Sequence, residues 1–187
     1  MTVPNIITTL RILLAPVFVI YLINDHLIAG LIILIISGIS DGVDGMVARL
    51  FNQKSRLGTY LDPLADKITL VSAFVALTTQ DYLPFWLTVT VISRDILILV
   101  GVSILFLINL TFSVRPTLSS KVTTCFQFIT IIAVLSRELI LLPPEFYHAL
   151  FYVTAFFTIV SFLQYMYQWF KLVGEDHPDN GKAVQGQ

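Results

Sequence analysis

Four aspartates lie close together in a chain that carries few charges. Asp41 and Asp44 are three residues apart, Asp62 and Asp66 are four apart, and all four fall within 26 positions. Side chains three or four residues apart share one face of an α-helix, so each pair projects from one side of its helix. Two helices joined by a loop of about eight residues are expected to be antiparallel neighbours, an arrangement that brings the four carboxylates together.

The residues around these acids suit a bulky, charged ligand. Oxygen ligands without His or Cys favour Mg²⁺ or Mn²⁺ over Zn²⁺. Gly45 and Ala48 lie on the same helix face as Asp41, and Gly58 lies one turn before the second acid pair, so the backbone is open to a ligand there. Arg49 is positioned to neutralise a phosphate.

An ionised Asp at the centre of a membrane helix costs roughly 2.5–3.5 kcal/mol, so four of them require compensation. The residue types and spacing leave three explanations open. These are metal-assisted catalysis, a proton or cation pathway in a transporter, and structural ion pairs between helices.

The composition indicates a membrane protein. Of 187 residues, 56% are hydrophobic and 12% are charged, whereas an ordinary soluble domain is about 25% charged. The net charge of −1 argues against a nucleic-acid partner, since nucleic-acid binding depends on a basic surface. The single cysteine, Cys125, provides no disulfide framework.

The elements that must position the aspartates are six apolar runs, each of about the 20 residues that a membrane span needs. They cover approximately 6–24, 27–50, 58–79, 83–110, a fifth run entered through 115–121 and ending near 142, and 146–172. We expect an all-α, polytopic integral membrane protein with six transmembrane helices, preceded by a short interfacial N-terminal segment. Residues 1–173 form one transmembrane domain, and residues 174–187 form a polar tail predicted to be disordered.

The basic residues of the loops predict the orientation in the membrane. One set of loops carries Arg49, Lys54, Arg56, Arg115, Lys121, Lys171 and Lys182, whereas the opposite loops NDH, QDY and LLPPE carry neither Lys nor Arg. Because Lys and Arg concentrate in cytoplasmic loops, we expect both termini and the four aspartates at the cytoplasmic face of an inner or plasma membrane.

The stretch from Asp41 to Asp66, DGVDGMVARLFNQKSRLGTYLDPLAD, resembles the signature of the CDP-alcohol phosphotransferase family, D-x2-D-G-x2-A-R-x8-G-x3-D-x3-D, at all eight specified positions. The resemblance implies six transmembrane helices, a homodimer, and metal-dependent transfer of a phosphatidyl group from CDP-diacylglycerol to an alcohol with release of CMP. It also implies that residues 1–173 are the catalytic domain.

The resemblance assigns roles to residues of this chain. It makes Asp41, Asp44, Asp62 and Asp66 the ligands of two divalent cations, Mg²⁺ or Mn²⁺, and it makes Asp66 the base that takes the proton of the acceptor hydroxyl. The cytidine diphosphate site it implies is formed by Asp41, Gly45, Ala48, Arg49 and Gly58.

Shorter stretches bear on the acceptor. The opening VPNIITTLRILLAPVFV resembles the phosphatidylglycerophosphate synthase and eukaryotic-type cardiolipin synthase branch, and VISRDILIL and RPTLSSKVTTCFQ resemble the cardiolipin synthases more closely. The implied acceptor is glycerol 3-phosphate or phosphatidylglycerol.

Either acceptor needs cations for its phosphate, and the candidates are Arg94, Arg115 and Lys121. The alternative for Arg94 is a salt bridge with Asp95 or with an aspartate of the metal site. For Arg115 and Lys121 the alternative is anchoring at the cytoplasmic face. An ion-coupled transporter that uses the same carboxylates is the alternative from another class of protein.

Overall fold

The structure is a computed structural model that describes the backbone of residues 3–50, 56–107 and 118–175, and the side chains of 13–40, 66–101, 103–104 and 118–171. Within these ranges the chain forms six helices and no strand, which confirms the all-α class. The helices are α1 (Val3–Ile23), α2 (Leu27–Leu50), α3 (Arg56–Thr79), α4 (Phe85–Leu107), α5 (Leu118–Leu135) and α6 (Pro144–Glu175).

Most helix limits agree with the apolar runs to within a few residues, and the end of α5 differs most. The prediction that the fifth helix ends near Leu142 is wrong, because α5 ends at Leu135 and hydrogen-bonded turns follow it. The last helix, α6, continues to Glu175, so it includes the first two residues of the predicted tail. The rest of that tail, 176–187, lies outside the described residues.

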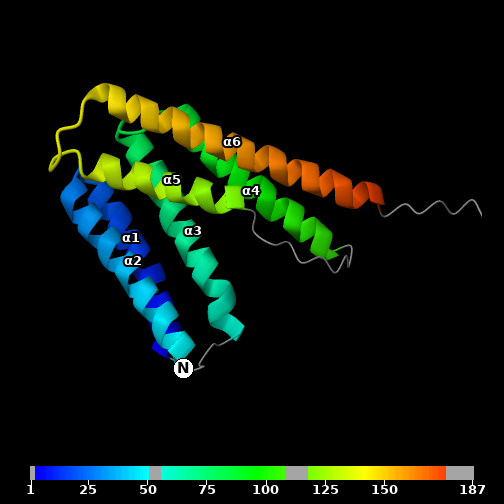
Figure 1. The fold of residues 1–187 in the computed structure, drawn as a ribbon. Coiled ribbons are helices and arrows are strands. Elements are labelled where there is room, and N and C mark those ends of the chain that lie inside the picture. Colours follow the sequence, from blue (N-terminus) through cyan, green and yellow to red (C-terminus); the bar gives the residue numbers. More distant parts are fainter. Residues whose placement is uncertain (1–2, 51–55, 108–117, 176–187) are drawn as a thin grey trace, which may run out of the picture.

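The helices form two groups of three (Figure 1). In the first group α1 packs against both α2 and α3, and in the second α6 packs against both α4 and α5. The groups meet where α5 contacts α2 and α3, and where α3 contacts α4. A single buried core that includes Phe18, Phe74, Leu87, Ile131 and Phe151 spans both groups.

The three turns α1–α2, α3–α4 and α5–α6 lie together at one end of the molecule. Gln80 donates a hydrogen bond from its side chain to the carbonyl of Ile23, and the Tyr82 hydroxyl donates to the carboxylate of Asp25. The guanidinium carbon of Arg137 lies 4.9 Å from the centroid of the Tyr82 ring. These turns contain the NDH, QDY and LLPPE loops, which therefore share one end, and the α5–α6 turn also contains Arg137.

The described surface is rich in exposed apolar side chains. Leu13, Ile39, Phe85 and Tyr167 are each more than 60% exposed, whereas Arg94, Thr123 and Gln127 are buried. By length and composition, two helical segments, Leu118–Leu135 and Pro144–Lys171, are long and apolar enough to cross a membrane among the described residues. Leu13–Ile23 and Leu27–Ser40 are shorter apolar segments.

Candidate functional site

The aspartates predicted to bind metal lie on two helices that run in opposite directions from a short connection. Asp41 and Asp44 belong to α2, and Asp62 and Asp66 belong to α3. The side chain of Asp66 is described and is half-buried. The predicted site residues whose side chains lie outside the described residues are Asp41, Asp44, Gly45, Ala48, Arg49, Gly58 and Asp62.

The expectation that α2 and α3 pack directly against each other is wrong for the described part of the chain. There, α1 and α5 each contact both helices, and α2 and α3 are not in contact with each other. Gly30 of α2 explains the packing on α1, because a Cβ at Gly30 would lie 2.5 Å from the Leu22 side chain. The glycine therefore lets α1 approach α2 closely.

A cavity lies between α2, α3 and α5, beside Asp66. Its volume is about 390 Å³, and its lining includes Ser37 and Gly38 of α2, Thr69 of α3 and Phe128 of α5 in addition to Asp66. The polar residues of the lining are Ser37, Asp66 and Thr69, and the rest of the wall is apolar. The one predicted metal ligand with a described side chain thus faces a largely apolar space that α2 and α3 share.

The donor set of the predicted metal centre suits a hard cation. All four residues offer carboxylate oxygens, the ligands that Mg²⁺ and Mn²⁺ prefer. Among the side chains that the structure describes, no group of three His, Cys, Asp or Glu residues is close enough to hold a metal ion. Three of the four predicted ligands lie outside that set, so the metal centre stays a prediction.

The candidate cations for an acceptor phosphate have different surroundings. Lys121 is exposed near the start of α5, and Arg115 lies outside the described residues. Arg94 is only 5% exposed. Its Nη1 donates to Asp95 Oδ1 at 2.8 Å, and its Nη2 donates to Ser120 Oγ at 2.8 Å and Ser161 Oγ at 2.6 Å. These contacts support the salt bridge with Asp95 that was the alternative for Arg94.

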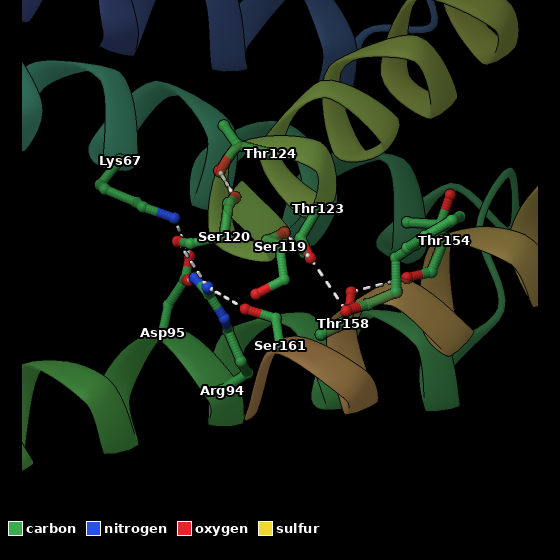
Figure 2. Close-up of polar contacts among 11 residues, drawn as sticks. Lys67, Arg94, Asp95, Ser119, Ser120, Thr123, Thr124, Thr154, Thr158 and Ser161 are labelled. Atoms are coloured by element: carbon green, nitrogen blue, oxygen red, sulfur yellow. Dashed lines mark hydrogen bonds and ion pairs between the residues drawn. The ribbon is translucent and has the colours of Figure 1, made fainter. Parts of the chain in front are cut away.

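Asp95 accepts hydrogen bonds from two cations (Figure 2). Its Oδ1 accepts from Arg94, and its Oδ2 accepts from Lys67 Nζ at 2.6 Å. The Asp95 side chain is 9% exposed and that of Lys67 is 35% exposed. Through these bonds and those of Arg94, polar contacts link α3, α4, α5 and α6 at the level of the residue that follows Asp66.

The interface between α5 and α6 contains a line of buried polar side chains that the sequence analysis missed. Thr123 donates to the carbonyl of Phe157 at 2.9 Å, and the hydroxyls of Thr130 and Thr154 are 2.7 Å apart. Gln127, between these two contacts on α5, is fully buried. The signal was present in the sequence, because polar residues three or four positions apart in an apolar helix form one stripe.

At the opposite end from Asp66, an aromatic cavity of about 700 Å³ lies among the turns, with Tyr82, Trp86, Arg137 and Tyr147 in its lining. The hydrogen bond from the Tyr82 hydroxyl to Asp25 raises the pKa of Tyr82 above its ordinary value of 10.0, and partial burial raises it further. Tyr82 is therefore a neutral hydrogen-bond donor at physiological pH.

Comparison with known proteins finds one family that matches most of the chain. The description of that family is CDP-alcohol phosphatidyltransferase, and the match covers residues 1–160. It includes α1 to α5, part of α6, and the whole stretch from Asp41 to Asp66.

Individual relatives carry two kinds of name. A cardiolipin synthase (CMP-forming) of Rattus norvegicus is 33% identical over 92% of this chain and 63% of its own length. Another from Streptomyces coelicolor is 40% identical over 56% of this chain and 52% of its own length. The CDP-diacylglycerol–glycerol-3-phosphate 3-phosphatidyltransferase of Aquifex aeolicus is 29% identical over 72% of this chain and 75% of its own length. The chain thus spans less than two thirds of these two cardiolipin synthases.

Proposed function

The chain belongs to the CDP-alcohol phosphatidyltransferase family, and on this basis we propose that it transfers the phosphatidyl group of CDP-diacylglycerol to a glycerol-phosphate-type alcohol and releases CMP. The observation that carries the proposal is the complete signature from Asp41 to Asp66, which falls on α2 and α3 within the matched region. The described end of that signature, Asp66, lines a mostly apolar cavity that suits the acyl region of a lipid substrate.

The reaction forms one phosphorus–oxygen bond and breaks another. The acceptor hydroxyl oxygen attacks the phosphorus of the phosphatidyl group, and the bond from that phosphorus to the oxygen of CMP breaks. The hydroxyl proton passes to the Asp66 carboxylate, and CMP leaves with the bonding electron pair. Asp41, Gly45, Ala48, Arg49 and Gly58 hold the cytidine diphosphate.

Asp41, Asp44, Asp62 and Asp66 would hold two divalent cations, Mg²⁺ or Mn²⁺. When bound, two such cations would bind the pyrophosphate and stabilise the negative charge that develops during transfer. A carboxylate beside a cation is a weak base. We therefore expect Asp66 to orient the acceptor hydroxyl as well as to accept its proton.

The acceptor we favour is phosphatidylglycerol, which would make the activity that of a cardiolipin synthase. The match to the rat cardiolipin synthase covers more of this chain, at higher identity, than the match to the Aquifex phosphatidyltransferase, whose name specifies glycerol 3-phosphate. We assign the acceptor phosphate to the cationic region of Arg94, Arg115 and Lys121. Lys121, which is exposed, offers a direct contact, whereas Arg94 has its Nη atoms committed to three other side chains.

We further propose that all six helices span an inner or plasma membrane, with the first turns of α1 at the interface and the aspartates and both termini cytoplasmic. The exposed apolar side chains on every described helix support this placement, as do the three turns at the opposite end, in which Arg137 is the one Lys or Arg residue. A homodimer is the expected assembly of the family.

Purified protein with CDP-diacylglycerol, Mg²⁺ or Mn²⁺, and either phosphatidylglycerol or glycerol 3-phosphate tests the activity. We expect release of CMP and a product mass equal to that of cardiolipin with the first acceptor. Asp66→Asn should abolish CMP release, whereas Asp81→Asn, an exposed change in the distant α3–α4 turn, should leave it unchanged. Absence of CMP release with both acceptors would contradict the proposed enzyme.

The same preparation separates an enzyme from an ion-coupled transporter. Replacing Gly45 with Leu should block the nucleotide site and stop CMP release, whereas a proton or cation pathway has no need for a small residue there. Ion flux into liposomes without nucleotide, retained in this variant, would favour the transporter.

A further inference from the structure

The Lys67–Asp95 ion pair spans an open cleft between α3 and α4. A cavity of about 650 Å³ separates the two helices, and both charged residues line it together with apolar side chains such as Val71 and Leu99. Lys67 Nζ and Asp95 Oδ2 are 2.6 Å apart. The pair therefore holds together two helices that are otherwise separated at this level.

Asp95 is also bound by Arg94. Arg94 donates to its second carboxylate oxygen and is itself anchored on Ser120 of α5 and Ser161 of α6 (Figure 2). Asp95 thus belongs to the group of α4, α5 and α6, and Lys67 is the residue of α3 that it binds.

Polar side-chain contacts between α3 and α4 include two that lie far apart along the helices. One is between the hydroxyls of Thr78 and Thr88, 2.5 Å apart near the turn. The other is the Lys67–Asp95 pair, which lies about 16 Å further along α3 at 1.5 Å per residue. Because the first contact is close to the turn, the second is the one that ties the part of α3 that bears Asp66 to α4.

Lys67 also follows Asp66 directly. Successive residues of a helix point about 100° apart, so Asp66 lines the cavity shared with α2 and α5 while Lys67 reaches α4. The ammonium of Lys67 ends a flexible four-carbon chain. Without the Asp95 carboxylate, this cation is free to turn toward the carboxylates of Asp66 and its neighbours, where it competes with a divalent cation.

We infer that Asp95 is a positioning residue, which holds the Lys67 ammonium away from the metal-binding carboxylates and fixes the Asp66 region of α3 against α4. The inference rests on the proposed metal centre. It predicts that the loss of Asp95 weakens metal binding through Lys67, and that removing the charge of Lys67 reverses this loss.

The test measures Mn²⁺ binding to the purified full chain by electron paramagnetic resonance, without substrate. We expect Asp95→Asn to weaken Mn²⁺ binding about five- to tenfold, the effect of one additional positive charge close to a divalent cation. The double variant Asp95→Asn with Lys67→Gln should return to within about twofold of Lys67→Gln alone. Asp81→Asn, in the distant turn, is the matched control and should bind Mn²⁺ like the unmodified chain.

Binding by Asp95→Asn equal to that of the unmodified chain would overturn the inference, and so would a double variant as weak as Asp95→Asn. If Asp95→Asn does not fold, Asp95→Glu serves instead, because it keeps the negative charge but displaces the Lys67 ammonium. We expect Asp95→Glu to weaken Mn²⁺ binding about two- to threefold. Unchanged Mn²⁺ binding by this variant would again overturn the inference. An unmodified chain that binds no Mn²⁺ would instead refute the metal centre itself.

Discussion

Replacing Arg94 with Met should destabilise the contact between α4, α5 and α6 strongly. The guanidinium is 5% exposed and donates to Asp95, Ser120 and Ser161 at 2.6–2.8 Å. Met has an unbranched, flexible side chain, so it retains much of the apolar packing of the Arg stem. The substitution therefore removes the charge and the three donors while it disturbs the surrounding helices little.

The size of the effect follows from what each partner has left. Breaking a buried ion pair costs about 3–5 kcal/mol when the remaining charge has no other partner. Asp95 keeps Lys67 at 2.6 Å, and serine hydroxyls in a helix can donate to their own helix carbonyls, so we expect about 3 kcal/mol, at the lower end of that range. For a chain of this size, this corresponds to a fall in melting temperature of about 6–12 °C.

Thermal unfolding in detergent, followed by circular dichroism or by tryptophan fluorescence, measures this fall. The matched control is Arg137→Met, because Arg137 is exposed and its described contact is with the Tyr82 ring. That contact is worth about 0.5–1 kcal/mol at an exposed site. If Arg94→Met melts no lower than Arg137→Met, the network centred on Arg94 does not stabilise the packing of α4, α5 and α6.

Two further predictions concern the first helix pair and the turn end. Gly30→Ala should lower the free energy of unfolding by about 1–2 kcal/mol, because the added Cβ would lie 2.5 Å from the buried Leu22 side chain. The control is Gly38→Ala, whose added Cβ would meet nothing within 4 Å and should leave the free energy of unfolding unchanged. Equal melting temperatures for the two variants would contradict this prediction. Tyr82→Phe should cost about 0.5–1 kcal/mol through loss of the exposed hydrogen bond to Asp25. Since the pKa of Tyr82 is raised above 10.0, that contribution is fully present at pH 7–9 and is lost as the pH rises through the raised pKa. Melting curves of both proteins from pH 7 to 11 check this, and a difference that persists at the highest pH would contradict it.

The sequence predicted the helices well because each apolar run is bounded by polar or Pro-containing turns. It failed at the end of α5, where Leu139, Ile140, Leu141 and Leu142 continue the apolar run beyond the helix. Apolar composition reports an apolar environment, not backbone conformation. Pro143 disfavours helical conformation for the residue before it, and the chain leaves the helix earlier, at Leu135.

The neighbours of each helix were harder to predict than the helices. The short connection between α2 and α3 restricts only the ends that it joins, whereas packing along the helices depends on side-chain shape. Gly30 admits Leu22 of α1, so α1 occupies the place beside α2 that the connection length suggested for α3. The partners of Arg94 were equally hidden, since Ser120 and Ser161 are 26 and 67 residues away in the chain.

The packing of the helices and the network around Arg94 together make α3 the link between the two parts of the proposed site. The metal ligands we propose belong to α2 and α3, in the first group of helices, whereas the described candidates for the acceptor phosphate, Arg94 and Lys121, belong to the second group. α3 contacts both α4 and α5, and at the level of Asp66 it is tied to the second group through Lys67 and Asp95. A change in that link therefore alters the distance between the two halves of the proposed site, even though neither Lys67 nor Asp95 needs to touch a substrate.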